Sequence, residues 1–174
     1  MTTNFNIAEL ANYFNADDIE WRIQQCGWKQ DKPWAMVLAY VTNRAIMSRL
    51  DEVCTPFGWQ NQFVVESDNA ISCGISIKCD NEWITKWDAA EPTDIEKVKG
   101  GRSSAMKRAA VHWGIGRYLY NLEATFAQCI TDYPPQQEKQ LWHKHYDKKA
   151  NKGFFWKTPN LPKWALPTGN NNGD

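Results

Sequence analysis

Residues suited to acid–base, nucleophilic or metal chemistry are few and scattered along this chain. His112 lies in a basic segment, and His143 and His145 stand two positions apart in a lysine-rich one. That spacing is not typical of zinc ligands, and the five cysteines form an odd set without a CxxC pair. The sequence therefore predicts no metal site, no disulfide framework and no catalytic residues, and the cysteines are expected to be reduced thiols.

Nucleotide chemistry is not indicated either. The chain has no GxxxxGK[ST] motif, and its one GxG, at Gly114 and Gly116, falls within a helical pattern. We expect no cofactor and no enzyme activity. One enzymatic alternative is a metal-dependent nuclease that uses Asp88, Glu91 and Asp94, although acids at a helix start are favoured by the exposed N–H groups alone.

Charge is distributed unevenly in a chain that is neutral as a whole. Twenty Lys and Arg balance twenty Asp and Glu, yet residues 97–117 hold six bases and no acid. Residues 139–163 hold seven Lys against one Asp, whereas residues 1–21 hold four acids and no base. This asymmetry is typical of a local basic surface that binds a polyanion, and it also allows acidic-to-basic contacts between copies of the chain.

The first basic segment has helical spacing. In a helix, Lys97, Gly101, Ser104 and Arg108 share one stripe, and Lys107 flanks Arg108. Small residues between the cations let a phosphate chain approach the backbone, which favours DNA or RNA binding. A solvated helix face is the alternative explanation of the same pattern.

Ten tryptophans are many for this length, and indoles can stack on unpaired bases. Alternation with polar residues indicates core packing for one group: Trp21, Trp83, Trp87 and Trp113. Neighbouring lysines make a second group the better candidates for exposed stacking: Trp28, Trp34, Trp156 and Trp164.

The elements that position these residues follow from hydrophobic periodicity. A short helix capped by Asn6 precedes a half-buried strand over 19–25 that puts Arg22 on its wetter face. A loop separates this strand from an apolar run over 34–40, which fits a central strand but is too short to be told from a buried helix by its period. A helix starts at Asn43 and turns Ile46, Leu50, Val53 and Phe57 toward the core, with Arg49 left for solvent.

An antiparallel meander is the clearest signal in the sequence. Strands are expected near 62–66, 71–79 and 82–87, with turns at Asp68-Asn69 and Asp80-Asn81. A helix capped by Thr93 can run to Leu122, with Gly100-Gly101 marking a kink or the close approach of a ligand or chain. Its apolar side can seal it to the sheet, so the fold class is α+β.

Length and composition limit the organisation of the chain. With 174 residues we expect one domain over 1–133 and a Lys/Trp/Pro-rich tail over 134–174 that is irregular and partly flexible. No apolar run approaches the ~20 residues that cross a bilayer, and the start lacks the layout of a secretion signal. The protein is expected to stay where it is made, in the cytoplasm.

Three blocks of the sequence resemble a known family. They are IEWRIQQCGWKQDKPWAMVLAYVTNRAIMSRLDEVCTPFGWQ, CGISIKCDNEWITKWDAAEPT and KGGRSSAMKRAAVHWGIGRYLYNL. In order and spacing they resemble the phage single-strand DNA annealing proteins of the Rad-fifty-two superfamily, of the Sak type, over about residues 15–125. The resemblance implies a twisted sheet packed on a long helix, with subunits joined into a ring or filament.

The resemblance also implies a function and a site. Single-stranded DNA would lie in a basic groove and be annealed without ATP, in phage recombination in the host cytoplasm. By position, Arg22 matches the groove arginine and Lys107 with Arg108 the basic pair of the long helix, and Lys97, Lys99 and Arg102 add further cations. Lys78 and Lys86 lie near a second DNA site of the family.

Two alternatives to annealing remain open at this point. A passive single-stranded nucleic-acid-binding protein would share the groove but protect strands instead of joining them, and the nuclease described above would degrade them. The tail can also dock on a host single-strand-binding protein.

Overall fold

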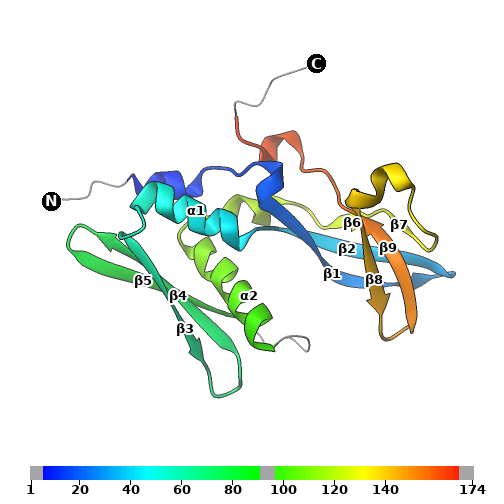
Figure 1. The fold of residues 1–174 in the computed structure, drawn as a ribbon, viewed down its shortest axis with the longest axis horizontal. Coiled ribbons are helices and arrows are strands. Elements are labelled where there is room, and N and C mark those ends of the chain that lie inside the picture. The colour runs from blue at the N-terminus through cyan, green and yellow to red at the C-terminus, as the bar shows by residue number, and fades with distance from the viewer. Residues whose placement is uncertain (1–5, 91–96, 169–174) are drawn as a thin grey trace. The chain divides into compact units, whose positions relative to one another are not determined.

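The computed structural model describes residues 6–90 and 97–168, with the side chains of 97–99 left out of the description (Figure 1). The chain folds into two compact units. Unit 1 comprises residues 1–19, 41–118 and 166–174, and unit 2 comprises residues 20–40 and 119–165. Each unit is described by itself below. No helix in the described part of the chain is long and apolar enough to cross a membrane.

The meander of unit 1 consists of β3 (Trp59–Val65), β4 (Ile71–Cys79) and β5 (Glu82–Ala90), paired antiparallel with β4 in the centre. Both turns lie where the sequence predicts them, and Asn69 and Asp80 adopt the left-handed conformation that Asn and Asp tolerate, with φ of 65° and 51°. Alternate residues of β4 are fully buried, as the period-2 pattern requires: Ile71, Cys73, Ile75 and Ile77.

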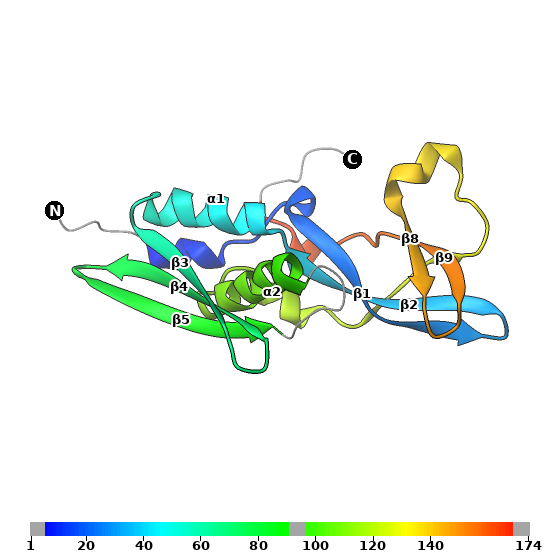
Figure 2. The ribbon, with the colours of Figure 1, turned by 60° about the horizontal axis from the view of Figure 1, so that its bottom comes forward.

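Helix α2 (Lys97–His112) packs on this buried face, as Figures 1 and 2 show. Its contact side is made of small residues and Met106, with Ala105, Ala109 and Ala110 fully buried. Trp113 follows the helix and donates a hydrogen bond from Nε1 to the Ile75 carbonyl at 2.9 Å. The expected α+β fold, an antiparallel meander packed on a basic helix, is therefore confirmed.

The ends of α2 differ from the sequence-based prediction. The helix does not continue to Leu122, because Gly114 and Gly116 adopt positive φ of 91° and 69° and turn the chain out of the helix. A 3₁₀ helix follows at Arg117–Asn121. The predicted cap at Thr93 lies outside the described residues.

The two glycines in α2 neither kink nor restart the helix, which continues through them. A Cβ on Gly101 would lie 2.7 Å from Ile71 Cδ1 of β4. Close packing of helix on sheet therefore explains this glycine without a ligand or a neighbouring chain.

Helix α1 (Asn43–Cys54) begins at Thr42, whose hydroxyl accepts a hydrogen bond from the Ala45 N–H. Its buried stripe includes Ile46 and Leu50, as predicted. The helix ends before Phe57, because Thr55 adopts a φ of 59°, and Phe57 is 91% exposed instead of buried.

Arg49 was expected to face solvent, but its side chain is largely covered. Its guanidinium donates to the carbonyls of Glu9 and Asn12 and lies 4.1 Å from the centre of the Phe14 ring. It thereby ties α1 to the N-terminal segment, whose short helix is a 3₁₀ turn at Ile7–Ala11 without a side-chain cap from Asn6. A second 3₁₀ turn, Ala16–Asp18, precedes the first strand.

Unit 2 contains two small antiparallel sheets. The first is β1 (Ile19–Lys29), β2 (Lys32–Val41) and β6 (Thr125–Ala127), with β2 in the centre. The prediction of a loop directly after residue 25 is wrong, because β1 continues to Lys29. Gln30 and Asp31 then form a two-residue hairpin turn, with φ of 50° and 59°, that matches strand twist.

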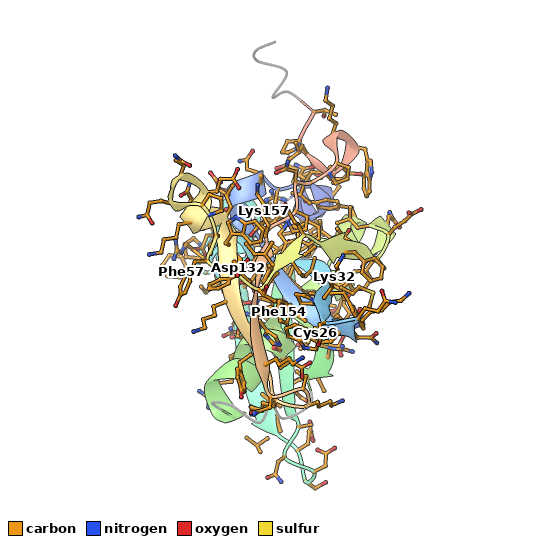
Figure 3. The ribbon with its side chains drawn as sticks, turned by 90° about the vertical axis from the view of Figure 1, so that its right-hand side faces the viewer. Cys26, Lys32, Phe57, Asp132, Phe154 and Lys157 are labelled. Atoms are coloured by element: carbon orange, nitrogen blue, oxygen red, sulfur yellow. The ribbon has the colours of Figure 1, made fainter. Side chains whose placement is uncertain are left out.

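The second sheet has two of its three strands, β8 (Trp142–Asp147) and β9 (Lys152–Lys157), in the segment predicted to be irregular. Strand β9 pairs with both β8 and β7 (Cys129–Ile130), and 3₁₀ turns lie at Gln136–Leu141 and Lys163–Ala165. Phe154 and Trp156 of β9 join Ala35 and Val37 of β2 in one buried cluster, and Cys26 of β1 packs against it. Phe154 and Cys26 are labelled in Figure 3. Burial of these aromatic side chains accounts for regular structure in a segment rich in Lys and Pro. The domain boundary near residue 133 stays a prediction.

The tryptophans divide differently from the expectation. Trp113 is buried as predicted, but Trp83 and Trp87 are 44% and 43% exposed. Trp156, expected to be exposed, is buried, whereas Trp164 is exposed as predicted. All five cysteines are free thiols.

Candidate nucleic-acid interface

The cations of α2 occupy different environments. Arg102 and Arg108 are exposed, and the Arg102 guanidinium lies 5.6 Å from the centre of the Phe63 ring of β3. Lys107 is only 9% exposed and already takes part in an interaction within the chain. Lys97 and Lys99 lie outside the described side chains. The helix thus presents Arg102 and Arg108 to solvent, with Lys107 largely covered beside them.

Asp88 of β5 is the carboxylate of this surface. Its Oδ1 lies 3.2 Å from Arg108 Nε and its Oδ2 lies 3.1 Å from His112 Nε2. Burial by itself raises the pKa of Asp88, but hydrogen bonds from the Ala89 N–H, Arg108 and His112 outweigh burial and hold the pKa below its ordinary value. The Arg108 side chain remains 58% exposed, so the ion pair leaves it accessible to a phosphate.

Two further cations gather at the C-terminal end of α2. Lys86 Nζ and Arg117 Nη2 donate to the His112 carbonyl at 3.0 and 2.9 Å, and Arg117 Nε donates to the Val111 carbonyl at 2.9 Å. Cations are favoured there because the last carbonyls of a helix lack partners and carry partial negative charge. Arg117 was not among the predicted site residues. Gly114 and Gly116 could have identified it, because glycines that end a helix place the cation that follows them near the last helix carbonyls.

Arg22 is placed by β1 in unit 2. Its side chain is 51% exposed, which confirms the predicted wetter face, and its Nη2 lies 3.0 Å from Glu20 Oε1. This pair is on the surface, where an ion pair contributes about 1 kcal/mol or less and yields readily to another anion. Its convergence with the cations of α2 on one polynucleotide stays a prediction.

Lys78 and Lys86 lie on opposite faces of the meander. Lys86 stands opposite Ile75, whose side chain is on the face that α2 covers. Lys78 is three residues from Ile75 along β4, so its side chain is on the other face, beside its partner Trp83. Lys86 lies 4.3 Å from the centre of the Trp113 ring, on the α2 side. Only Lys78 therefore belongs to the face that α2 leaves open.

Of the three acids proposed for a nuclease, the structure describes only Asp88, and this carboxylate is engaged in ion pairs. Asp88 is held by Arg108 and His112, and Glu91 and Asp94 lie outside the described residues. Within the described part of the chain, no three His, Cys, Asp or Glu side chains come together in a way that could hold a metal ion.

An exposed group of arginines on a helix that packs against an antiparallel meander is an arrangement that suits a polyanionic chain. Comparison with known proteins agrees, because the model of the Rad52/22 family double-strand break repair protein matches residues 5–138. The chain belongs to the Rad52/22 family, which confirms the superfamily indicated by the three sequence blocks.

Two curated relatives are similar over most of the chain. The single-stranded DNA-binding protein DdrA of Deinococcus radiodurans is 30% identical over 156 residues, which cover 88% of this chain and 64% of the relative. The protein of the same name from Deinococcus deserti is 30% identical over 140 residues, covering 79% and 59%. The chain thus spans about three fifths of the length of these relatives. No solved structure matches it significantly.

Proposed function

We propose that this protein binds single-stranded DNA and anneals complementary strands without a nucleotide cofactor, as a homo-oligomer acting in phage recombination in the host cytoplasm. The observation that carries the proposal is the folding of residues 97–117, six bases and no acid, into a helix and turn that expose Arg102, Arg108 and Arg117. Membership of a double-strand break repair family and relatives named for single-stranded DNA binding support it.

The proposed mechanism needs no fuel. Arginine and lysine that grip phosphates release counterions and bind any sequence, while the base edges stay free to test a second strand. Pairing then gains ~1.4 kcal/mol per stacked step. A protein that extends the strands and lowers their mutual repulsion therefore accelerates a reaction that is already downhill.

The proposed contacts follow from the cations described above. Arg102 and Arg108 of α2 and Arg22 of β1 contact the phosphates, and Arg117 extends the surface beyond the helix. Lys97, Lys99 and Lys107 complete the basic character of α2. Lys78 and Lys86 form a second DNA site only if DNA contacts both faces of the meander.

The experiment is annealing of labelled complementary oligonucleotides without nucleotide or metal. Lys107→Ala with Arg108→Ala should slow annealing about tenfold or more, because two positive charges leave the phosphate site. Since Lys107 is largely buried, Arg102→Ala with Arg108→Ala serves as a second variant that changes exposed side chains only.

Lys148→Ala with Lys149→Ala is the matched control, because it removes the same charge from exposed lysines between β8 and β9. Equal annealing by wild type and both helix variants contradicts the site. Strand retention in a gel without annealing identifies a passive binder, and magnesium-dependent degradation identifies a nuclease.

Assembly is the second part of the proposal. A groove shared between subunits requires several copies on one strand, and the acidic 1–21 and basic 97–117 segments provide charge complementarity between copies. Mass measurement of the free and DNA-bound protein tests this. A monomer in both states contradicts a shared groove.

We also propose that residues 134–174 dock on a host single-strand-binding protein. Trp164, 48% exposed, is the exposed tryptophan among the described residues of this segment and is suited to anchor a partner. Binding measured against the purified host protein should weaken with Trp164→Ala, and unchanged binding rejects this anchor.

A further inference from the structure

The meander has a second face, opposite the one that α2 covers. This outer face consists of the even-numbered residues of 60–64 and 72–78 and the odd-numbered residues of 83–89, which the strand register places together. These positions hold amides, hydroxyls, two indoles and one lysine, together with Val64, Gly74 and Ala89, and none is a carboxylate. Glu66, one residue beyond β3, accepts a hydrogen bond from Ser72 at one end of the face.

Trp87 lies flat on this face. It stands opposite Gly74, and a Cβ on Gly74 would come within 2.6–2.8 Å of three atoms of the indole ring. The ring therefore rests on the glycine backbone, which leaves its other side turned outward and 43% of the residue exposed. A flat aromatic ring held by a glycine is pre-organised for stacking and loses little rotational freedom when a planar ligand binds.

Trp83 lies on the same face further along β5, opposite Lys78 instead of a glycine. It is 44% exposed and lies four residues from Trp87, about 13 Å along a strand. Thr85 between the indoles is bonded to Ser76 at 2.8 Å, so the floor between the two rings is polar and already hydrogen-bonded.

We propose that the outer face of the meander binds unpaired nucleobases of single-stranded DNA by stacking on Trp87 and Trp83. The inference rests on the proposed function. It assigns the bases to a surface separate from the arginines of α2, because the two faces of one sheet cannot contact the same phosphate.

Charge and shape favour a polynucleotide over a protein partner on this face. Exposed Gln60 and Gln62 offer amide donors and acceptors beside the indoles. Lys78 supplies a cation, and no strand position of this outer face holds a carboxylate that would repel phosphate. Sheets that present aromatic side chains among polar residues are a recurring way to bind unpaired bases.

The experiment measures affinity for oligo-dT and for an abasic oligonucleotide of the same length. Trp83→Ala with Trp87→Ala should weaken oligo-dT binding about fivefold or more per indole, the usual effect of losing one stacked base. Binding to the abasic strand, which keeps only phosphates and sugars, should be equal for wild type and variant.

Phenylalanine at both positions should restore much of the oligo-dT affinity, since a smaller aromatic ring still stacks. Ile84→Ala is the matched control: Ile84 is also 44% exposed on β5 but belongs to the opposite face. Circular dichroism and thermal unfolding check that each variant folds.

The outcomes of these measurements distinguish failure of the stacking site from failure of the proposed DNA-binding function. If wild type binds no single-stranded DNA, the proposed function fails. If wild type binds but the tryptophan variant binds oligo-dT equally well, stacking alone is rejected. A change in oligomeric mass with unchanged affinity assigns the face to contacts between copies and likewise overturns the inference.

Discussion

The two faces of the β3–β4–β5 meander are covered in different ways. On the inner face, α2 buries Ile75 and Ile77 and brings Arg108 beside Asp88 at the solvent boundary. On the outer face, the Trp87 ring of the neighbouring strand covers Gly74, and the buried Ser76 is hydrogen-bonded to Thr85. One sheet thus presents cations through a helix on one side and aromatic rings directly on the other.

The difference shows why charge and stacking can be separated experimentally. Phosphate contacts depend on salt, because each releases condensed counterions, whereas stacking on an indole releases none. The two faces should therefore respond differently to salt.

The largest expected effect comes from Arg102→Ala with Arg108→Ala. Affinity for single-stranded DNA at low salt should fall about tenfold or more, and the slope of log affinity against log salt should flatten by about 1.4, at ~0.7 per phosphate contact. The tryptophan variant should lose affinity at an unchanged slope. Equal slopes for wild type and the arginine variant, measured by fluorescence anisotropy, would show that these arginines do not contact the phosphates.

Next in size is the effect of adding a methyl group to a glycine on each face. Gly74→Ala should destabilise the protein by about 1–3 kcal/mol, because the new Cβ meets a rigid indole and must displace Trp87. Oligo-dT affinity should fall with it, since the ring would lose its flat position.

Gly101→Ala is the counterpart on the inner face. Its Cβ meets the terminal methyl of Ile71, the flexible end of a side chain, and alanine gains about 1 kcal/mol over glycine in a helix. Chemical denaturation should therefore place this variant within about 1 kcal/mol of wild type. If Gly101→Ala proves the more harmful change, the indole is more mobile than its contact with Gly74 indicates.

Sequence periodicity was sufficient for most of the inner face. Alternation in 71–79 located β4 and its buried residues, and helical spacing in 97–113 identified the side of α2 that packs on them. Periodicity could not predict the exposure of the outer face, because alternation shows that a strand has two faces but not which tertiary element covers each. Trp83 and Trp87 were therefore expected in the core.

Similar reasons explain the other departures from expectation. Lys-rich and Pro-rich composition suggested an irregular tail, yet Phe154 and Trp156 bury enough apolar surface to order a hairpin. Arg49 has the pattern of a solvent-facing residue but satisfies carbonyls from a segment about 40 positions away. Contacts between distant segments carry no local signal. For the candidate site, the sequence located the basic helix and the exposed side of β1, while the covering of Lys107 depends on tertiary packing.

A smaller effect is expected from Asp88→Asn, which removes the carboxylate that competes with phosphate for Arg108. Affinity for single-stranded DNA should rise by about two- to fivefold, the range in which one screened surface charge acts. The rise should be largest at low salt and should disappear in an Arg108→Ala background. Asn keeps the shape of the side chain, so a lower affinity would mean that Asp88 orients Arg108 for binding instead of competing for it.

The smallest effect concerns acid stability and the same carboxylate. Because the pKa of Asp88 is lower in the folded protein than its ordinary value, the ionised group favours folding above the ordinary pKa of ~3.9, and this contribution is lost as the pH falls through the lower folded value. Wild type should exceed Asp88→Asn in unfolding free energy by about 1 kcal/mol or less at pH 6, the usual range for a partly exposed ion pair. Denaturant titrations repeated down to pH 3 should show the gap closing. A gap that widens in acid would mean that the protonated carboxyl is the form held by Arg108 and His112, and the Asp88 ion pairs would then have no part in placing the arginine.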